Sequence, residues 1–114
     1  MMTIEDIERF GADTKAGVGR CMGNSDFYIR LFKMMPNDQN FGLLYDAIEK
    51  GDLDSAFEAA HALKGALGNL SITALYEPVQ NLTELLRART QMDYSDLVAA
   101  IKAKHEEMKK LCES

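Results

Sequence analysis

Apolar residues recur along the chain at helical spacing, and almost no stretch alternates as a half-buried strand would. The pattern predicts two short helices near the N-terminus, over residues 4–10 and 13–22, and five longer segments over residues 25–35, 41–50, 52–70, 78–89 and 94–112. We therefore predict an all-α fold, a single domain over residues 1–114 in which an antiparallel four-helix bundle (25–112) follows one or two short extra N-terminal helices (1–22).

Local signals set several of the expected helix ends. Thr3, with Asp6 three residues later, approximates a capping box at the start of the chain. Gly51 is typical of a helix C-terminal cap. Pro36 should break or kink the helix that begins near residue 25. A helix is expected to restart after Ser71, and Pro78 fits a first turn or a kink, so the regular part of this helix is expected to begin at Pro78.

The helix over residues 52–70 contains two interior glycines, Gly65 and Gly68, and each costs about 1 kcal/mol relative to alanine. At about 100° per residue, one face of this helix is an apolar stripe. The stripe consists of Leu53, Ala56, Ala60, Leu63, Leu67 and Leu70. His61 points about 130° away from the stripe, toward solvent, and both glycines lie on the histidine side.

Several chemically useful groups share the face that His61 occupies. Lys64, at i+3, can bring its ammonium group to the same space, and the glycines leave room beside the imidazole. A neutral imidazole is available near pH 7 and can act as a nucleophile, so the arrangement suits a transferable anion such as a phosphoryl group. The alternative is that the helix simply ends at Gly65 or Gly68, although the leucine period continues through Leu70.

Three further residues lie within about 60° of His61 on the same helix. Phe57 is either an aromatic at the edge of the core or an apolar docking contact for a partner. Asp54 and Glu58 are interpreted as solvated charges near the helix start, which favour the helix dipole, and not as catalytic acids.

Composition narrows the possible functions. The 114 residues carry a formal net charge of −5, which disfavours a general nucleic-acid-binding role. No apolar stretch reaches the roughly 20 residues of a membrane-spanning helix, and the acidic N-terminus does not resemble a signal peptide. Cys21 and Cys112 are too few for a disulfide framework, so we expect free thiols, a cytoplasmic location and no membrane partner.

The stretch HALKGALGNL resembles the signature of histidine-containing phosphotransfer (Hpt) domains, which is His-x-x-Lys-Gly followed by small residues. The stretches GRCMGNSDFYIRLFKMM and AIEKGDLDSAFEAAHALKG are similar to the same family in order and spacing, so the resemblance covers nearly the whole chain. It implies that His61 is the phosphoacceptor and that Lys64 stabilises the phosphoryl group. Gly65 and Gly68 would be the clearance residues, on the second helix of the bundle.

The resemblance implies a phosphocarrier and not a self-contained enzyme. In such domains, a histidine accepts a phosphoryl group from an aspartate of a receiver domain and passes it to another receiver. The expected partners are therefore receiver domains of response regulators, a hybrid sensor kinase, or both. We expect no cofactor in this chain, because the Mg²⁺ belongs to the receiver, and we expect a monomer.

Two positions depart from the family pattern. Ser71 stands where a glycine is common, which affects only the helix end. Many members place a glutamine near the histidine on the following helix, and the aligned residue here is Thr83. Gln80, one turn earlier, or Arg87, one turn later, lies on the same face and could take that place.

Three other function classes are alternatives to a phosphocarrier. A helical protein-binding module would have His61 as an ordinary surface residue. A metal site would draw on His61, His105, Cys21 and Cys112, but these lack the spacing of known sites, and His105 is predicted to be partly buried and hydrogen-bonded. An ATP-dependent kinase would need a glycine-rich nucleotide-binding segment, which the sequence lacks.

Overall fold

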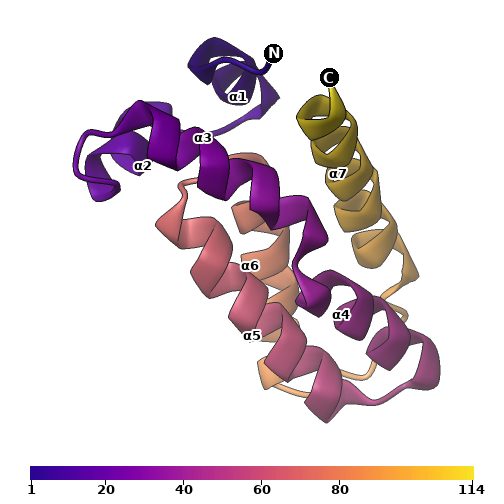
Figure 1. Cartoon of the computed structure of the whole chain (residues 1–114). Coiled ribbons are helices and arrows are strands. Elements are labelled where there is room, and N and C mark those ends of the chain that lie inside the picture. The colour runs from indigo at the N-terminus through magenta and orange to yellow at the C-terminus, as the bar shows by residue number, and fades with distance from the viewer.

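The computed structural model describes residues 1–114 and contains only helices, which confirms the all-α prediction. The helices are α1 (Ile4–Phe10), α2 (Thr14–Arg20), α3 (Ser25–Met34), the 3₁₀ turn η1 (Met35–Asn37), α4 (Gln39–Lys50), α5 (Leu53–Asn69), α6 (Thr73–Arg87) and α7 (Ser95–Glu113). Short turns join α4 to α5 and α5 to α6, so neighbouring helices run antiparallel (Figure 1).

The long helices form a bundle around α5 and α6. Helix α5 packs along α4 and α6, and α7 packs along α6 and η1. Helices α3 and α4 follow one another across the bundle, and α1 lies at the same end as the C-terminus (Figure 1). If α3, η1 and α4 are counted as one broken helix, α5 is the second helix of the bundle, as the family resemblance implied.

The helix that begins at Ser25 is interrupted at Pro36, as predicted, and His105 of α7 packs against this interruption. The carbonyl oxygen of Pro36 accepts a hydrogen bond from Nε2 of His105 at 2.8 Å. Nδ1 of His105 must then be the acceptor of the 3.0 Å bond from the Tyr45 hydroxyl, whose pKa burial raises far above its usual value. The His105 ring also stacks on Phe41, with 3.7 Å between centroids. His105 is thus hydrogen-bonded, as predicted, and it is buried more fully than the sequence suggested.

Helix α6 restarts after Ser71, as predicted, but its regular part begins before Pro78. The helix begins at Thr73, five residues before Pro78, which lies inside it. The carbonyl oxygen of Ile72 accepts the backbone amides of Leu75 and Tyr76, at 3.1 and 2.8 Å, and these bonds form the first turn. Pro78 removes only one backbone donor, and the full burial of Leu75 in the preceding turn offsets that loss.

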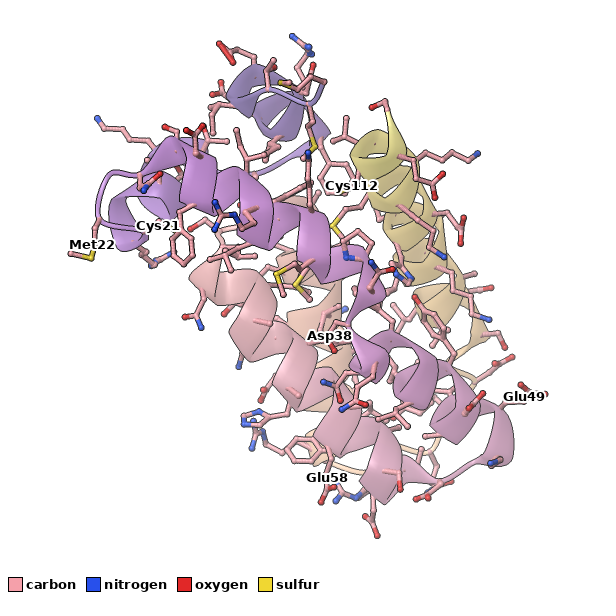
Figure 2. The ribbon with its side chains drawn as sticks, viewed as in Figure 1. Cys21, Met22, Asp38, Glu49, Glu58 and Cys112 are labelled. Carbon is pink, nitrogen blue, oxygen red and sulfur yellow. The ribbon has the colours of Figure 1, made fainter.

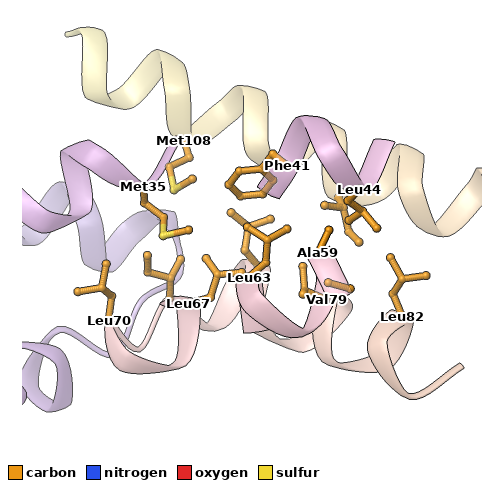
Figure 3. Close-up of a cluster of buried hydrophobic side chains, with 14 of the residues drawn as sticks. Met35, Phe41, Leu44, Ala59, Leu63, Leu67, Leu70, Val79, Leu82 and Met108 are labelled. Atoms are coloured by element: carbon orange, nitrogen blue, oxygen red, sulfur yellow. The ribbon is translucent and has the colours of Figure 1, made fainter. Parts of the chain in front are cut away.

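The apolar stripe predicted for α5 faces the core. Leu63 and Leu67 are fully buried and point into the space occupied by Phe41 and Met108 (Figure 3). Leu53, at the first turn of α5, is only half-buried. Because this stripe fixes the rotation of α5, the opposite face must lie at the surface.

Helices α2 and α3 contact the C-terminal end of α5. The ring of Tyr28 in α3 lies directly over Gly17 of α2, and its hydroxyl donates to the carbonyl oxygen of Leu70 at 2.7 Å. Arg20 donates to the carbonyl oxygen of Gly68 at 3.0 Å and also to the Ser71 hydroxyl. Residues far apart in sequence therefore hold the turn after α5 in one position.

Gly17→Ala is expected to destabilise the protein by about 2–4 kcal/mol, which combines overpacking with the strain on a buried hydrogen bond. A Cβ at Gly17 would lie 2.3 Å from Cε1 of Tyr28 and 2.9 Å from the backbone oxygen of Leu70. The Tyr28 ring is fully buried and cannot swing away. The measurement is the free energy of unfolding from urea titration.

The matched control for this variant is Gly19→Ala in the same helix. A Cβ at Gly19 meets no atom within 4 Å, so this change should leave stability equal or raise it by up to about 1 kcal/mol. Equal unfolding midpoints for the two variants would contradict the packing assigned to Gly17.

Both cysteines are free thiols (Figure 2). Cys21 is buried, and burial raises the pKa of the half-buried Cys112 thiol.

None of the helices combines the length and the apolar character needed to cross a bilayer. Histidine, cysteine and acidic side chains do not gather in any group of three or more that could hold a metal ion.

Candidate functional site

His61 occupies the middle of α5 and is exposed to solvent. Ala60, directly before His61, and Leu63, two residues after it, are fully buried, so the core fixes the direction in which the histidine points. The helix start is fixed as well, because the Asp52 carboxylate accepts the amide of Ser55 at 3.1 Å. The outward orientation predicted for the imidazole is confirmed.

A shallow hollow of about 240 Å³ adjoins the imidazole, between α5 and α6. It is lined by His61, Lys64, Gly65, Gly68, Asn69 and Tyr76. A Cβ at Gly65 would meet no atom within 4 Å, so the backbone there is open to an approaching group. At Gly68 a Cβ would lie 3.0 Å from Cε1 of Tyr76, so this glycine also makes room for the tyrosine ring.

Lys64 extends from α5 toward α6. Its ammonium nitrogen lies 3.9 Å from a carboxylate oxygen of Glu84, and its side chain is only 25% exposed. At this distance the pair is loose, so the ammonium group remains available to a stronger acceptor in the hollow. Lys64 is therefore held next to His61 without being tied to one partner.

The Phe57 ring lies against the imidazole, and two guanidinium groups lie over the Phe57 ring. The Phe57 ring stacks on His61, with centroids 5.6 Å apart and an interplanar angle of 18°. The guanidinium carbons of Arg87 and Arg89 lie 5.0 and 5.3 Å from the Phe57 centroid. Arg89 also bonds to the Asp54 carboxylate at 2.7 Å, so this acid pairs with a cation and is not simply solvated. The interpretation of Phe57 as an aromatic at the edge of the core fits its partial burial.

The two other expected contacts on α6, and Glu58 on α5, lie in different surroundings. Thr83 is fully buried and donates to the carbonyl oxygen of Val79 at 2.6 Å, so it cannot contact a partner, which corrects that expectation. Gln80 is exposed, and none of the side-chain hydrogen bonds involves it. Glu58 extends from α5 into solvent (Figure 2).

Sequence reasoning missed three residues that shape the site, Asn69, Tyr76 and Glu84. Tyr76 and Glu84 lie on α6, and their place beside α5 depends on the antiparallel register of the two helices. Ser71, in the turn that sets this register, has φ of +54°, which explains why a glycine would suit that position. A helical wheel of α5 alone carries no signal for the contacts that Tyr76 and Glu84 make from α6.

This arrangement can hold a small anion beside a nucleophile. The imidazole is exposed, a cation lies on the same face, and the backbone is uncovered at Gly65. No acid or base of the chain is hydrogen-bonded to the imidazole.

Comparison with known proteins gives one match. The model of the Hpt domain family matches residues 35–111, from η1 to near the end of α7, which is more than half of the chain. No curated protein and no solved structure matches the chain. The matched region contains the whole hollow around His61. The chain therefore belongs to the Hpt domain family, whose members carry phosphoryl groups on a histidine in phosphorelays.

Proposed function

We propose that this protein is a phosphorelay carrier in which His61 accepts a phosphoryl group from the aspartyl phosphate of one receiver domain and passes it to a second receiver. The observation that carries the proposal is the exposed imidazole beside Lys64 and the open backbone of Gly65. Membership of the Hpt family supports the same chemistry.

The transfer step makes one bond and breaks one bond. The lone pair of a ring nitrogen of His61 attacks phosphorus, and the bond between phosphorus and the aspartyl oxygen breaks. The electron pair of that bond leaves with the oxygen, which restores the carboxylate of the receiver. The other ring nitrogen gives up its proton to water, and the reverse sequence delivers the phosphoryl group to the next aspartate.

The proposed partners would supply the groups for transfer that this site does not contain. A receiver domain, free or within a hybrid sensor kinase, would supply the aspartate and a bound Mg²⁺ that neutralises the phosphoryl oxygens. This chain would contribute His61 as the phosphoacceptor and Lys64 as the cation that contacts the phosphoryl group. It would act as a cytoplasmic monomer with no cofactor of its own and would not use ATP directly.

Incubation with phosphoramidate tests the proposal without a cognate partner. The expected result is an increase in intact mass by one phosphoryl group, with a label that is stable in base and lost in acid. Peptide mapping should place the label on His61. A folded protein that acquires no label from phosphoramidate or from phosphorylated receivers would refute the carrier function and leave a protein-binding module.

Lys64→Ala is expected to slow phosphoryl transfer or shorten the phosphohistidine lifetime by about tenfold, which corresponds to about 1.4 kcal/mol. The change removes the ammonium group that lies beside the imidazole, and it breaks only the loose ion pair with Glu84, so the fold should stay intact. The measurement is the rate of label gain and loss by mass spectrometry.

The matched control is Lys109→Ala in α7. Lys109 also forms a surface ion pair, with Glu106 at 3.3 Å, but lies outside the hollow. Rates that are unchanged in Lys64→Ala, or that fall equally in both variants, would contradict the role assigned to Lys64.

A further inference from the structure

The orientation of the His61 ring is set by stacking and not by a hydrogen bond. Both ring nitrogens of the other histidine, His105, are hydrogen-bonded, whereas neither nitrogen of His61 has a partner in the protein. The nearest group with a defined geometry is the Phe57 ring, one turn earlier in α5. The 5.6 Å separation and 18° angle are typical of an offset-stacked aromatic pair.

The Phe57 ring is itself held by groups at the end of α6 and just after it. Arg87 and Arg89 both place guanidinium carbons within 5.3 Å of its centroid. Arg89 is anchored twice, to the Asp54 carboxylate at 2.7 Å and to the carbonyl oxygen of Leu86 at 2.6 Å. Because these anchors lie on both helices, the Phe57 ring is a fixed surface for the imidazole.

No side chain of α6 forms a hydrogen bond that would orient the His61 ring. Thr83, which aligns with the glutamine that many family members place near the histidine, is fully buried and donates to the carbonyl oxygen of Val79. Glu84 reaches toward Lys64 instead. Arg87 of α6 instead lies over Phe57, which stacks on His61.

We propose that Phe57 is the positioning residue for His61, an inference that rests on the phosphocarrier function proposed above. The lone pair of an imidazole nitrogen lies in the plane of the ring. A stacked neighbour on the ring face therefore fixes the plane and leaves both nitrogens free, one to attack phosphorus and the other to release a proton. A hydrogen-bonding partner would occupy one of the two nitrogens.

Two substitutions at Phe57 separate aromatic stacking from bulk. Phe57→Leu keeps an apolar side chain but removes the ring, and Phe57→Tyr keeps the ring. The matched control is Phe27→Leu, because Phe27 is another partly exposed phenylalanine, at 42%, and lies on α3 away from the hollow. Each variant is compared with the unchanged protein by the rate of labelling with phosphoramidate and by the NMR resonance of the His61 Cε1 proton.

Phe57→Leu should lower the labelling rate by about two- to tenfold, the range expected for the loss of one aromatic pair. The His61 Cε1 proton resonance should also shift, because the ring current of Phe57 is lost. Phe57→Tyr should retain both values, and Phe27→Leu should change neither. A shift without a rate loss, or a rate loss without a shift, would overturn the proposal.

The unchanged protein provides a measurement that does not depend on the folding of any variant. Nuclear Overhauser contacts between the Phe57 ring and the His61 ring protons are expected, and their absence would overturn the proposed stack. If these contacts are present but phosphoramidate never labels His61, the carrier function fails while the stack stands. If His61 is labelled and the contacts are absent, the carrier function stands and the positioning role fails.

Discussion

His61→Gln is expected to abolish phosphoryl acceptance and to leave the bundle folded. Glutamine keeps a polar side chain at an exposed position of α5, so the stability should change by less than about 0.5 kcal/mol. The amide nitrogen of glutamine has no free lone pair and cannot attack phosphorus. The measurement is the intact mass after incubation with phosphoramidate and with a phosphorylated receiver domain, alongside circular dichroism of the same sample.

The second histidine makes this test unambiguous. The chain contains two histidines, and His105 is 8% exposed with both ring nitrogens hydrogen-bonded, to Tyr45 and Pro36. It therefore cannot replace His61 as an acceptor. An acid-labile label that persists in folded His61→Gln would contradict the assignment of the phosphoacceptor.

The direction of His61 was predictable because it depends on a single helix. The buried stripe of α5 needs only the 3.6-residue period and the apolar identity of its members, among them Leu63 and Leu67. Once that stripe faces the core, the opposite residues have to face solvent. The helix break at Pro36 was predictable for a similar reason, since the missing amide acts locally.

The regular part of α6 begins earlier than predicted because tertiary packing outweighed a local signal. Pro78 favours a helix start, yet the buried side chains of Leu75 and Val79 draw the preceding turn into the helix as well. The contacts between helices could not be predicted from the sequence either, because they also depend on tertiary packing. The pairing of Lys64 with Glu84, and the contact of Arg87 with Phe57, depend on the register between α5 and α6.

The glycines of α5 show where sequence and structure complement one another. The sequence identified Gly65 and Gly68 as residues on the histidine face. The structure separates them, since Gly65 faces open space while Gly68 also accommodates the Tyr76 ring. Only Gly65 is therefore a position where a side chain would fit the fold and still obstruct the approach to His61.

Gly65→Gln is expected to lower the transfer rate from a receiver domain by about 100-fold, the effect of misplacing reacting groups by about 1 Å. Helical side chains lean toward the N-terminus, so a glutamine at this position would cover the imidazole one turn earlier. A Cβ there meets no atom within 4 Å, so the fold should be equally stable or gain up to about 1 kcal/mol from better helix propensity. Transfer rates and urea unfolding of the same preparation measure both effects.

Two variants isolate obstruction as the cause. Gly42→Gln in α4 makes the same change at another open helical glycine, and it should alter stability without altering transfer. Gly65→Ala adds only a methyl group and should reduce transfer less than glutamine does. Phosphoramidate is much smaller than a receiver domain, so labelling by phosphoramidate should be the less affected reaction in Gly65→Gln. Full receiver transfer in this variant would show that the open backbone at Gly65 is not what admits the partner.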